Sequence, residues 1–135
     1  MISLQQVFLD ENRLYGTIPA EVAVMASLQI FSVTNNDMTG TLPTHIGRLT
    51  MLQYLHVDDN EFTGPLPTEL GELSALEELF VHDNQLNGTL PTELGSLTAV
   101  TSLSLGRNDF TGTLPTEVGL ITACQNLWAP TNNIN

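Results

Sequence analysis

Apolar residues recur along this chain in a fixed frame of 24 residues. Each unit begins L-x-x-L-x-L, and its last three positions alternate between apolar and variable residues. That alternation is the period of a short strand with one buried face. The first position of successive units is held by Leu4, Leu28, Leu52, Leu76, Val100 and Cys124. The pattern therefore predicts short parallel strands lying side by side, one from each unit.

An asparagine follows each predicted strand at the point where the chain must turn away from the sheet. Its side-chain amide both donates and accepts hydrogen bonds, so it can satisfy backbone groups that the turn leaves unpaired. We therefore expect a ladder of stacked asparagines inside the repeat. The ladder positions are Asn12, Asn36, Asn60, Asn84, Asn108 and Asn132.

A glycine, a proline and the phrase Thr-Glu-Leu-Gly complete most units. The proline fixes φ and ends the preceding extended stretch, and a short helical turn on the outer side is predicted after it. Four threonines are expected to cap these turns: Thr44, Thr68, Thr92 and Thr116. The leucines that follow are expected to point back into the core.

The 135 residues hold five full units and half of a sixth, without insertion or deletion. We predict one solenoid over residues 1–135, with repeats starting near 4, 28, 52, 76 and 100 and a partial repeat from 124. A single unit cannot bury its own apolar face, and stacking the units buries all of them. Capping segments are missing, so we expect the ends to continue into further repeats or caps.

The consensus L-x-x-L-x-L-x-x-N-x-L-x-G-x-[IL]-P-x-x-[LIV]-G-x-L resembles the plant-type leucine-rich repeat, and the wording GTLPTELG is similar to its algal branch. The resemblance covers essentially the whole chain. It implies an α/β horseshoe with a concave parallel sheet, a second short strand around Thr-Gly-Thr-Leu, and 3-10 or helical turns on the convex side. Pro65 replaces a threonine of that second strand and is expected to remove a hydrogen-bond donor there.

Charge narrows the class of partner. The net charge is -12, with three arginines and no lysine. Phosphate binding needs a basic surface, so nucleic acid is not expected as a partner, and a cationic partner is favoured. No apolar run approaches the roughly 20 residues that span a bilayer, so we expect no membrane insertion in this segment. The first residues also lack the pattern of a signal peptide.

The variable positions of each strand are expected to point outward on the concave side. In the third and fourth units they bring aromatic and acidic side chains together, an arrangement typical of a protein-binding hot spot. The predicted binding surface consists of Tyr54, His56, Asp58, Asp59, Glu78, Phe80, His82 and Asp83. Replacing Phe80 by alanine is expected to abolish partner binding without loss of the fold.

The same residues raise two metal-binding alternatives. His82 is expected to neighbour Asp58 across one strand spacing, with His56 diagonally near. The run Asp58-Asp59-Asn60-Glu61 resembles a calcium loop, but Asn60 belongs to the ladder and the EF-hand spacing is absent. A surface histidine beside a carboxylate is the favoured interpretation, so the sequence predicts neither a metal nor a cofactor.

Catalysis is not expected either. Ser32 and Ser104 have no histidine and acid at chain positions that plainly converge on them. The glycines recur at intervals of 24 and form no phosphate-binding loop. Cys124 stands in a leucine column and is expected to be a small buried core residue.

Two features lie on the side edge of the predicted solenoid. Asn87-Gly88-Thr89 is the only N-x-[ST] sequon, and Asn87 is expected to carry a glycan if the protein is secreted. Threonine rows resemble the hydroxyl and methyl rows of ice-binding solenoids, although strand propensity also explains them. These rows are Thr39, Thr63 and Thr111 beside Thr17, Thr41, Thr89 and Thr113.

The sequence thus predicts a non-catalytic module that recognises a peptide, protein or glycan on its concave strand face. The resemblance implies an extracellular or cell-surface, receptor-like setting. A structural scaffold segment of a matrix, filament or larger complex is the alternative, and ice binding is the remote one.

Overall fold

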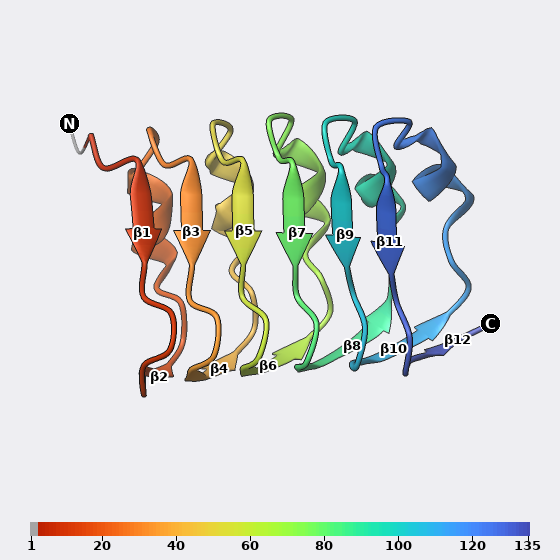
Figure 1. Ribbon diagram of the computed structural model, residues 1–135, viewed down its shortest axis with the longest axis horizontal. Helices are drawn as coiled ribbons and strands as arrows, with labels where there is room; N and C mark the ends of the chain where they lie inside the picture. Colours follow the sequence, from red (N-terminus) through yellow and green to blue (C-terminus); the bar gives the residue numbers. More distant parts are fainter. Residues whose placement is uncertain (1–2) are drawn as a thin grey trace.

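The computed structural model describes residues 3–135 and shows a solenoid of stacked coils (Figure 1). The prediction that the first residues lack a signal-peptide pattern includes residues 1 and 2, which lie outside the described residues. Each coil gives one strand to a six-stranded parallel sheet, the main sheet, and neighbours pair in steps of 24, as Leu55 does with Leu79. Its strands, in spatial and chain order, are β1 (Gln6–Phe8), β3 (Ile30–Ser32), β5 (Tyr54–His56), β7 (Glu78–Phe80), β9 (Ser102–Ser104) and β11 (Asn126–Trp128).

A second parallel sheet runs along one side of the solenoid (Figure 1). Its strands are β2 (Tyr15–Gly16), β4 (Asp37–Gly40), β6 (Glu61–Gly64), β8 (Gln85–Thr89), β10 (Asp109–Gly112) and β12 (Asn133–Ile134). Pairing here steps by 22 residues, as Thr63 with Gln85. The expectation for Pro65 is wrong, because β6 ends at Gly64 and the proline follows the paired segment.

The outer turns are 3-10 helices, which confirms the predicted leucine-rich-repeat solenoid class. They are η1 (Ala20–Val24), η2 (Thr44–Arg48), η3 (Thr68–Glu72), η4 (Thr92–Ser96) and η5 (Thr116–Leu120). The capping role predicted for the threonines is wrong. A proline such as Pro67 precedes each helix. Thr68 is the first residue of η3, and its hydroxyl donates to the neighbouring Glu69 carboxylate at 3.3 Å. None of the helices in the described residues has the length and hydropathy of a bilayer-spanning segment.

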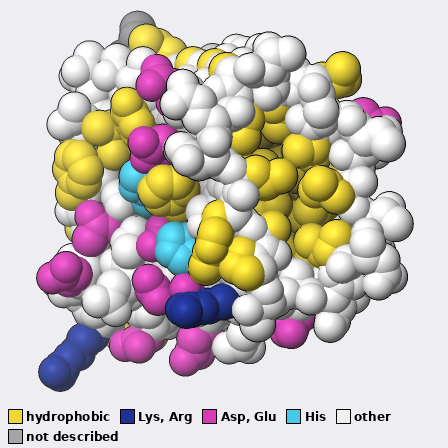
Figure 2. Space-filling model, turned by 45° about the vertical axis from the view of Figure 1, so that its right-hand side comes forward, with side chains coloured by type: hydrophobic (Ala, Val, Ile, Leu, Met, Phe, Trp, Pro, Cys, Tyr) yellow, Lys and Arg dark blue, Asp and Glu magenta, His cyan; other side chains and the backbone are white. Residues whose placement is uncertain are grey.

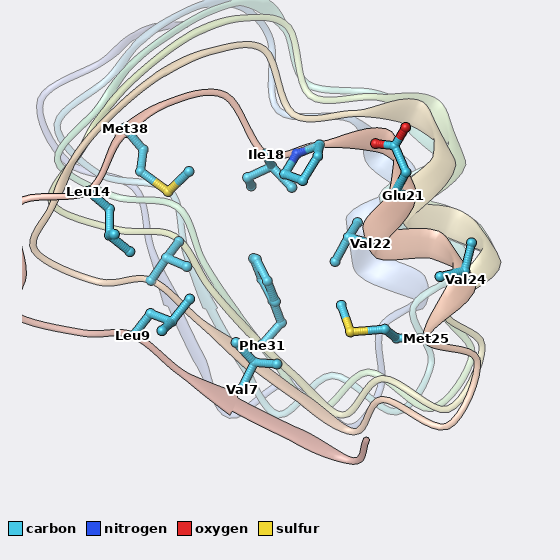
Figure 3. A pocket seen from close by; sticks show the side chains of 12 residues that line it. Val7, Leu9, Leu14, Ile18, Glu21, Val22, Val24, Met25, Phe31 and Met38 are labelled. Atoms are coloured by element: carbon cyan, nitrogen blue, oxygen red, sulfur yellow. The ribbon is translucent and has the colours of Figure 1, made fainter. Parts of the chain in front are cut away.

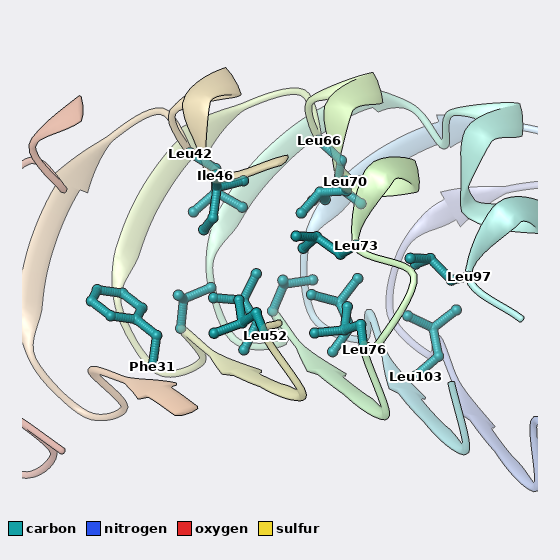
Figure 4. Packing of buried hydrophobic residues seen from close by; sticks show 14 of the residues in the cluster. Phe31, Leu42, Ile46, Leu52, Leu66, Leu70, Leu73, Leu76, Leu97 and Leu103 are labelled. Carbon is teal, nitrogen blue, oxygen red and sulfur yellow. The ribbon is translucent and has the colours of Figure 1, made fainter. Parts of the chain in front are cut away.

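The core is a continuous column of aliphatic side chains between the main sheet and the 3-10 helices (Figure 4). Leu52, Leu70, Leu73 and Leu76 have no exposed surface. Each coil contributes the same positions, so its side chains pack on those of the coils before and after it. The stacking therefore buries what a single coil would leave in water.

The asparagine positions fasten neighbouring coils together. Asn60 Nδ2 donates to the carbonyl of Val33 in the preceding coil at 2.9 Å and to that of Asp58 in its own coil at 3.0 Å. Its Oδ1 accepts the backbone N–H of Met38 at 3.0 Å. Asn36, Asn84, Asn108 and Asn132 repeat this arrangement with the coil before them. Asn12 is exposed, and its side chain donates only to carbonyls of its own coil.

Both terminal coils expose apolar positions that the inner coils bury. At the N-terminal coil, a largely apolar cavity of about 440 Å³ opens between strand and helix (Figure 3). At the other end Leu114, Leu120 and Leu127 are exposed. The prediction of a buried Cys124 is wrong, because this side chain is only half-buried where it packs against the core.

Candidate functional site

An unbroken line of aromatic rings crosses the outer face of the main sheet. We call it the aromatic row, and its members are Tyr54, His56, Phe80, His82 and Trp128. Each ring touches the next, with centroid separations from 4.5 to 6.1 Å. Edge-to-face and offset stacked pairs at such distances are the favourable geometries for aromatic rings.

The centre of the aromatic row follows from strand register. His56 and Phe80 are direct partners on β5 and β7, so their side chains leave the sheet on the same face one strand spacing apart. Their rings stack at 4.5 Å with an interplanar angle of 10°. Leu55 and Leu79, which directly precede these two residues in the chain, are buried in the core and anchor the two strands.

Trp128 joins the aromatic row from β11, two coils beyond His82. Its ring meets the His82 ring edge-on at 5.6 Å and 87°. It reaches that far because Gly106 lies beneath it: a Cβ at Gly106 would collide with the indole, meeting Cε3 at 2.6 Å. Trp128 was not among the residues predicted for the binding surface, although it shares a column with His56 and Phe80 and Gly106 stands in the adjacent column.

Carboxylates border the aromatic row. The Tyr54 hydroxyl donates to Glu77 Oε2 at 3.3 Å, and the negative charge of Glu77 is the main cause that raises the pKa of the Tyr54 phenol. His56 Nε2 lies 2.9 Å from Glu78 Oε2. Tyr54 therefore remains a neutral hydrogen-bond donor at neutral pH.

One cation lies on this border. Arg107 Nη1 pairs with Asp83 Oδ1 at 3.1 Å, and the guanidinium sits 6.0 Å from the centre of the Trp128 ring. An exposed ion pair of this kind is worth at most about 1 kcal/mol. It holds the two side chains at the C-terminal end of the aromatic row without neutralising the remaining carboxylates.

Asp58 differs from the other acids because it is buried. Its side chain is 8% exposed, and Oδ1 accepts the Thr34 hydroxyl at 3.1 Å. Burial is the main cause that raises the pKa of the Asp58 carboxyl, and the facing His82 imidazole partly offsets this. The carboxylate and the imidazole are 3.7 Å apart, too far for a direct hydrogen bond.

Ser104, His82 and Asp58 lie in a line across three coils, contrary to the expectation that no histidine and acid converge on this serine. Ser104 Oγ is 3.0 Å from His82 Nδ1, and His82 Nε2 faces Asp58 Oδ2. Ser32 instead donates its hydroxyl to Asp10. Because the Asp58–His82 gap exceeds a hydrogen bond and the line lies on an open sheet face, this geometry lacks the connected, enclosed constellation of a catalytic triad.

The structure brings the eight sequence-predicted residues onto one face, over β5, β7 and the turns that follow them. Histidines (cyan) lie there among hydrophobic and acidic side chains, next to apolar surface at the end of the solenoid (Figure 2). The anticipated grouping of His56 with Asp58 and His82 is changed: His56 pairs with Glu78, and Asp59 takes its place beside the other two.

The chain belongs to the leucine-rich repeat family, since the family described as leucine-rich repeat region matches residues 4–130. The fold is similar to receptor ectodomains of plants. It superposes on the ectodomain of the membrane receptor kinase GASSHO1/SCHENGEN3 from Arabidopsis thaliana, in complex with CASPARIAN STRIP INTEGRITY FACTOR 2, with a TM-score of 0.98 and 34% identity. It also matches the plant peptide hormone receptor RGFR1 in complex with RGF2 (TM-score 0.97, 28% identity) and PEPR1 with AtPEP1 (0.95, 31%).

These matches cover 99%, 98% and 97% of this chain, but only 16%, 21% and 18% of the respective receptor chains. The chain thus spans about a fifth or less of the length of these structures. No curated protein matches the sequence.

Proposed function

We propose that this chain is a non-catalytic ligand-binding module that recognises a peptide or protein on the face of its main sheet, as part of an extracellular, receptor-like protein. The observation that carries the proposal is the aromatic row: five touching rings, four on strands of the main sheet and His82 just after β7, that lie on one face of the solenoid. Clustered aromatics bordered by polar groups are the usual anchors of binding interfaces. The receptor structures similar to this chain hold peptides or protein factors in their complexes, which supports the same class of ligand here.

The charge of the face favours a basic ligand. Glu77, Glu78, Asp58 and Asp59 border the aromatic row, and Arg107 is the cation that the structure places against it. A lysine or arginine side chain can stack on a ring while its charge reaches a neighbouring carboxylate. The net charge of -12 also steers cationic ligands toward the molecule at low salt.

The experiment is a selection of random peptides displayed on phage against the purified chain, followed by affinity measurements on the peptides obtained. We expect basic peptides with an apolar or aromatic residue. Phe80→Ala should weaken them by about 2 kcal/mol or more while leaving the circular dichroism spectrum unchanged, because Phe80 is half-buried and its strand is held by Leu79.

Tyr15→Ala is the matched control. Tyr15 is an equally large aromatic, 87% exposed, on β2 of the second sheet. Its loss should leave peptide affinity unchanged. Equal affinities for wild type, Phe80→Ala and Tyr15→Ala would remove the aromatic row as the binding surface.

The geometry gives less support to the two alternative functions, a structural scaffold segment and ice binding. A scaffold segment needs no tuned face, whereas the aromatic row lies on strand positions whose residues vary from coil to coil. For ice binding, the threonine columns are not aligned across strands, because the 22-residue register pairs Thr39 with Glu61 and Thr63 with Gln85. Thr89 with Thr111 is one aligned threonine pair.

The extracellular setting has its own test. Asn87 is exposed on β8, so an N-glycan attached there would not disturb the core. We expect the chain, expressed behind a secretion signal in a eukaryotic cell, to carry one N-glycan that is absent from Asn87→Gln. An unmodified mass for the secreted wild type would contradict this assignment.

A further inference from the structure

Ser104, His82 and Asp58 lie in a line across three coils, and peptide binding by the aromatic row does not account for this arrangement. Asp58 is nine-tenths buried, its Oδ1 is occupied by Thr34, and its Oδ2 faces the Nε2 of His82 without a hydrogen bond. A carboxylate oxygen and an imidazole nitrogen that face each other without a hydrogen bond can instead bind a metal ion placed between them.

We propose that Asp58, His82 and Asp59 form a binding site for a divalent transition-metal ion, with Zn²⁺ as the best fit. One ligand atom from each residue lies within 4.8 Å of the others. The 3.7 Å between His82 Nε2 and Asp58 Oδ2 is close to the roughly 3.4 Å that separates two ligands of tetrahedral zinc with bonds of about 2.1 Å.

The imidazole is already oriented for this role. Ser104 Oγ lies 3.0 Å from His82 Nδ1 and can accept a hydrogen bond from the Nδ1–H, and in this tautomer the Nε2 lone pair faces Asp58 Oδ2. A hydrogen-bond acceptor on the second ring nitrogen is the usual companion of a metal-binding histidine. Ser104 is thus a positioning residue, and Trp128 holds the other side of the ring.

The donor set selects the kind of ion. Calcium and magnesium take oxygen ligands, whereas an imidazole with two carboxylates suits zinc and its neighbours. Asp59 is exposed, so it closes the site from the solvent side. Three protein ligands leave a fourth position for water or for a donor group of a bound partner.

Titration of the purified chain with ZnCl₂ by calorimetry tests the site, and the fluorescence of Trp128 provides a second readout. Trp128 is the only tryptophan, and its ring is 5.6 Å from that of His82. We expect one zinc ion per chain with a change in this fluorescence. His82→Gln and Asp58→Asn should each weaken zinc at least tenfold, and Ser104→Ala should weaken it less.

His45→Gln is the matched control, because His45 lies on η2 and takes no part in the site. Its zinc affinity should equal that of the wild type. Asparagine at position 58 keeps an oxygen for the Thr34 hydroxyl, and thermal unfolding of each variant shows whether the fold is intact.

The proposal is overturned if the wild type does not bind zinc at millimolar concentration. It is also overturned if His82→Gln and Asp58→Asn, correctly folded, bind zinc as the wild type does, since the ion is then adsorbed by the acidic surface in general. Neither outcome bears on peptide binding by the aromatic row, which the Phe80→Ala comparison tests separately.

Discussion

At the scale of single residues, one column of the strand face is set by backbone geometry. Asn35, Asp59 and Asp83 occupy it in three consecutive coils, with φ of 55°, 51° and 52°. Asparagine and aspartate tolerate this left-handed conformation better than other residues with a Cβ. The backbone conformation therefore favours aspartate at positions 59 and 83 without requiring it, since Glu11, Arg107 and Thr131 adopt the same φ in the other coils.

The asparagine ladder gives a prediction at this scale. In Asn60→Ala the N–H of Met38 loses its partner, and the carbonyl of Val33 keeps only the amide of Asn36. We expect the free energy of unfolding, measured with urea, to fall by about 1–3 kcal/mol, because the backbone N–H of the buried Met38 becomes unpaired.

Asn12→Ala is the control for that experiment. Its amide donates only to exposed carbonyls of its own coil, at Leu9 and Asp10. The change should have a clearly smaller effect. Equal losses in the two variants would mean that bonds between coils contribute nothing beyond local turn formation.

At the scale of elements, contact between successive 3-10 helices fixes the spacing of the coils. A Cβ at Gly71 would lie 2.7 Å from the carbonyl oxygen of Glu93 in the next helix, whereas a Cβ at Gly119 meets nothing within 4 Å. The same residue type at equivalent positions thus has different importance. Gly71 of η3 permits close packing against the next helix, whereas no described atom packs close to Gly119 of η5.

Alanine at these two glycines tests the packing. Gly71→Ala should destabilise the chain by about 1–3 kcal/mol, since backbone atoms of two helices must separate. Gly119→Ala should be neutral or slightly stabilising, because alanine restricts the unfolded chain. Thermal unfolding of the two variants measures the difference, and a stable Gly71→Ala protein would show that the coils can shift at little cost.

The sequence predicted the elements well where one position serves one purpose in every coil. Strands, outer turns and buried leucines recur each 24 residues, and the resemblance gave their arrangement. The prediction was wrong at the ends of strands and helices, which a column of equivalent residues does not define. Strand β6 ends at Gly64, one residue before Pro65, and proline, with its fixed φ, took the position before each helix that threonine was expected to hold.

At the scale of the whole molecule, the coils repeat one framework, and the residues that vary most between coils lie on the outer face of the main sheet. The candidate residues on β5 and β7 were predictable because they depart from the other coils. Trp128 was not, since its role depends on the ring crossing Gly106 to reach His82, a contact between coils that are not sequential. The burial of Asp58 was equally hidden, because Thr34 and His82 that cover it come from the coils on either side.

The most direct test of the account is a heteronuclear NMR titration of the labelled chain with a basic peptide obtained by the selection. If the peptide binds on the aromatic row, the largest amide shift changes occur on β5, β7 and β11, around Tyr54, Phe80 and Trp128, and the amides of Tyr15 and of the second sheet keep their shifts. Changes concentrated in the second sheet or on the 3-10 helices would contradict it.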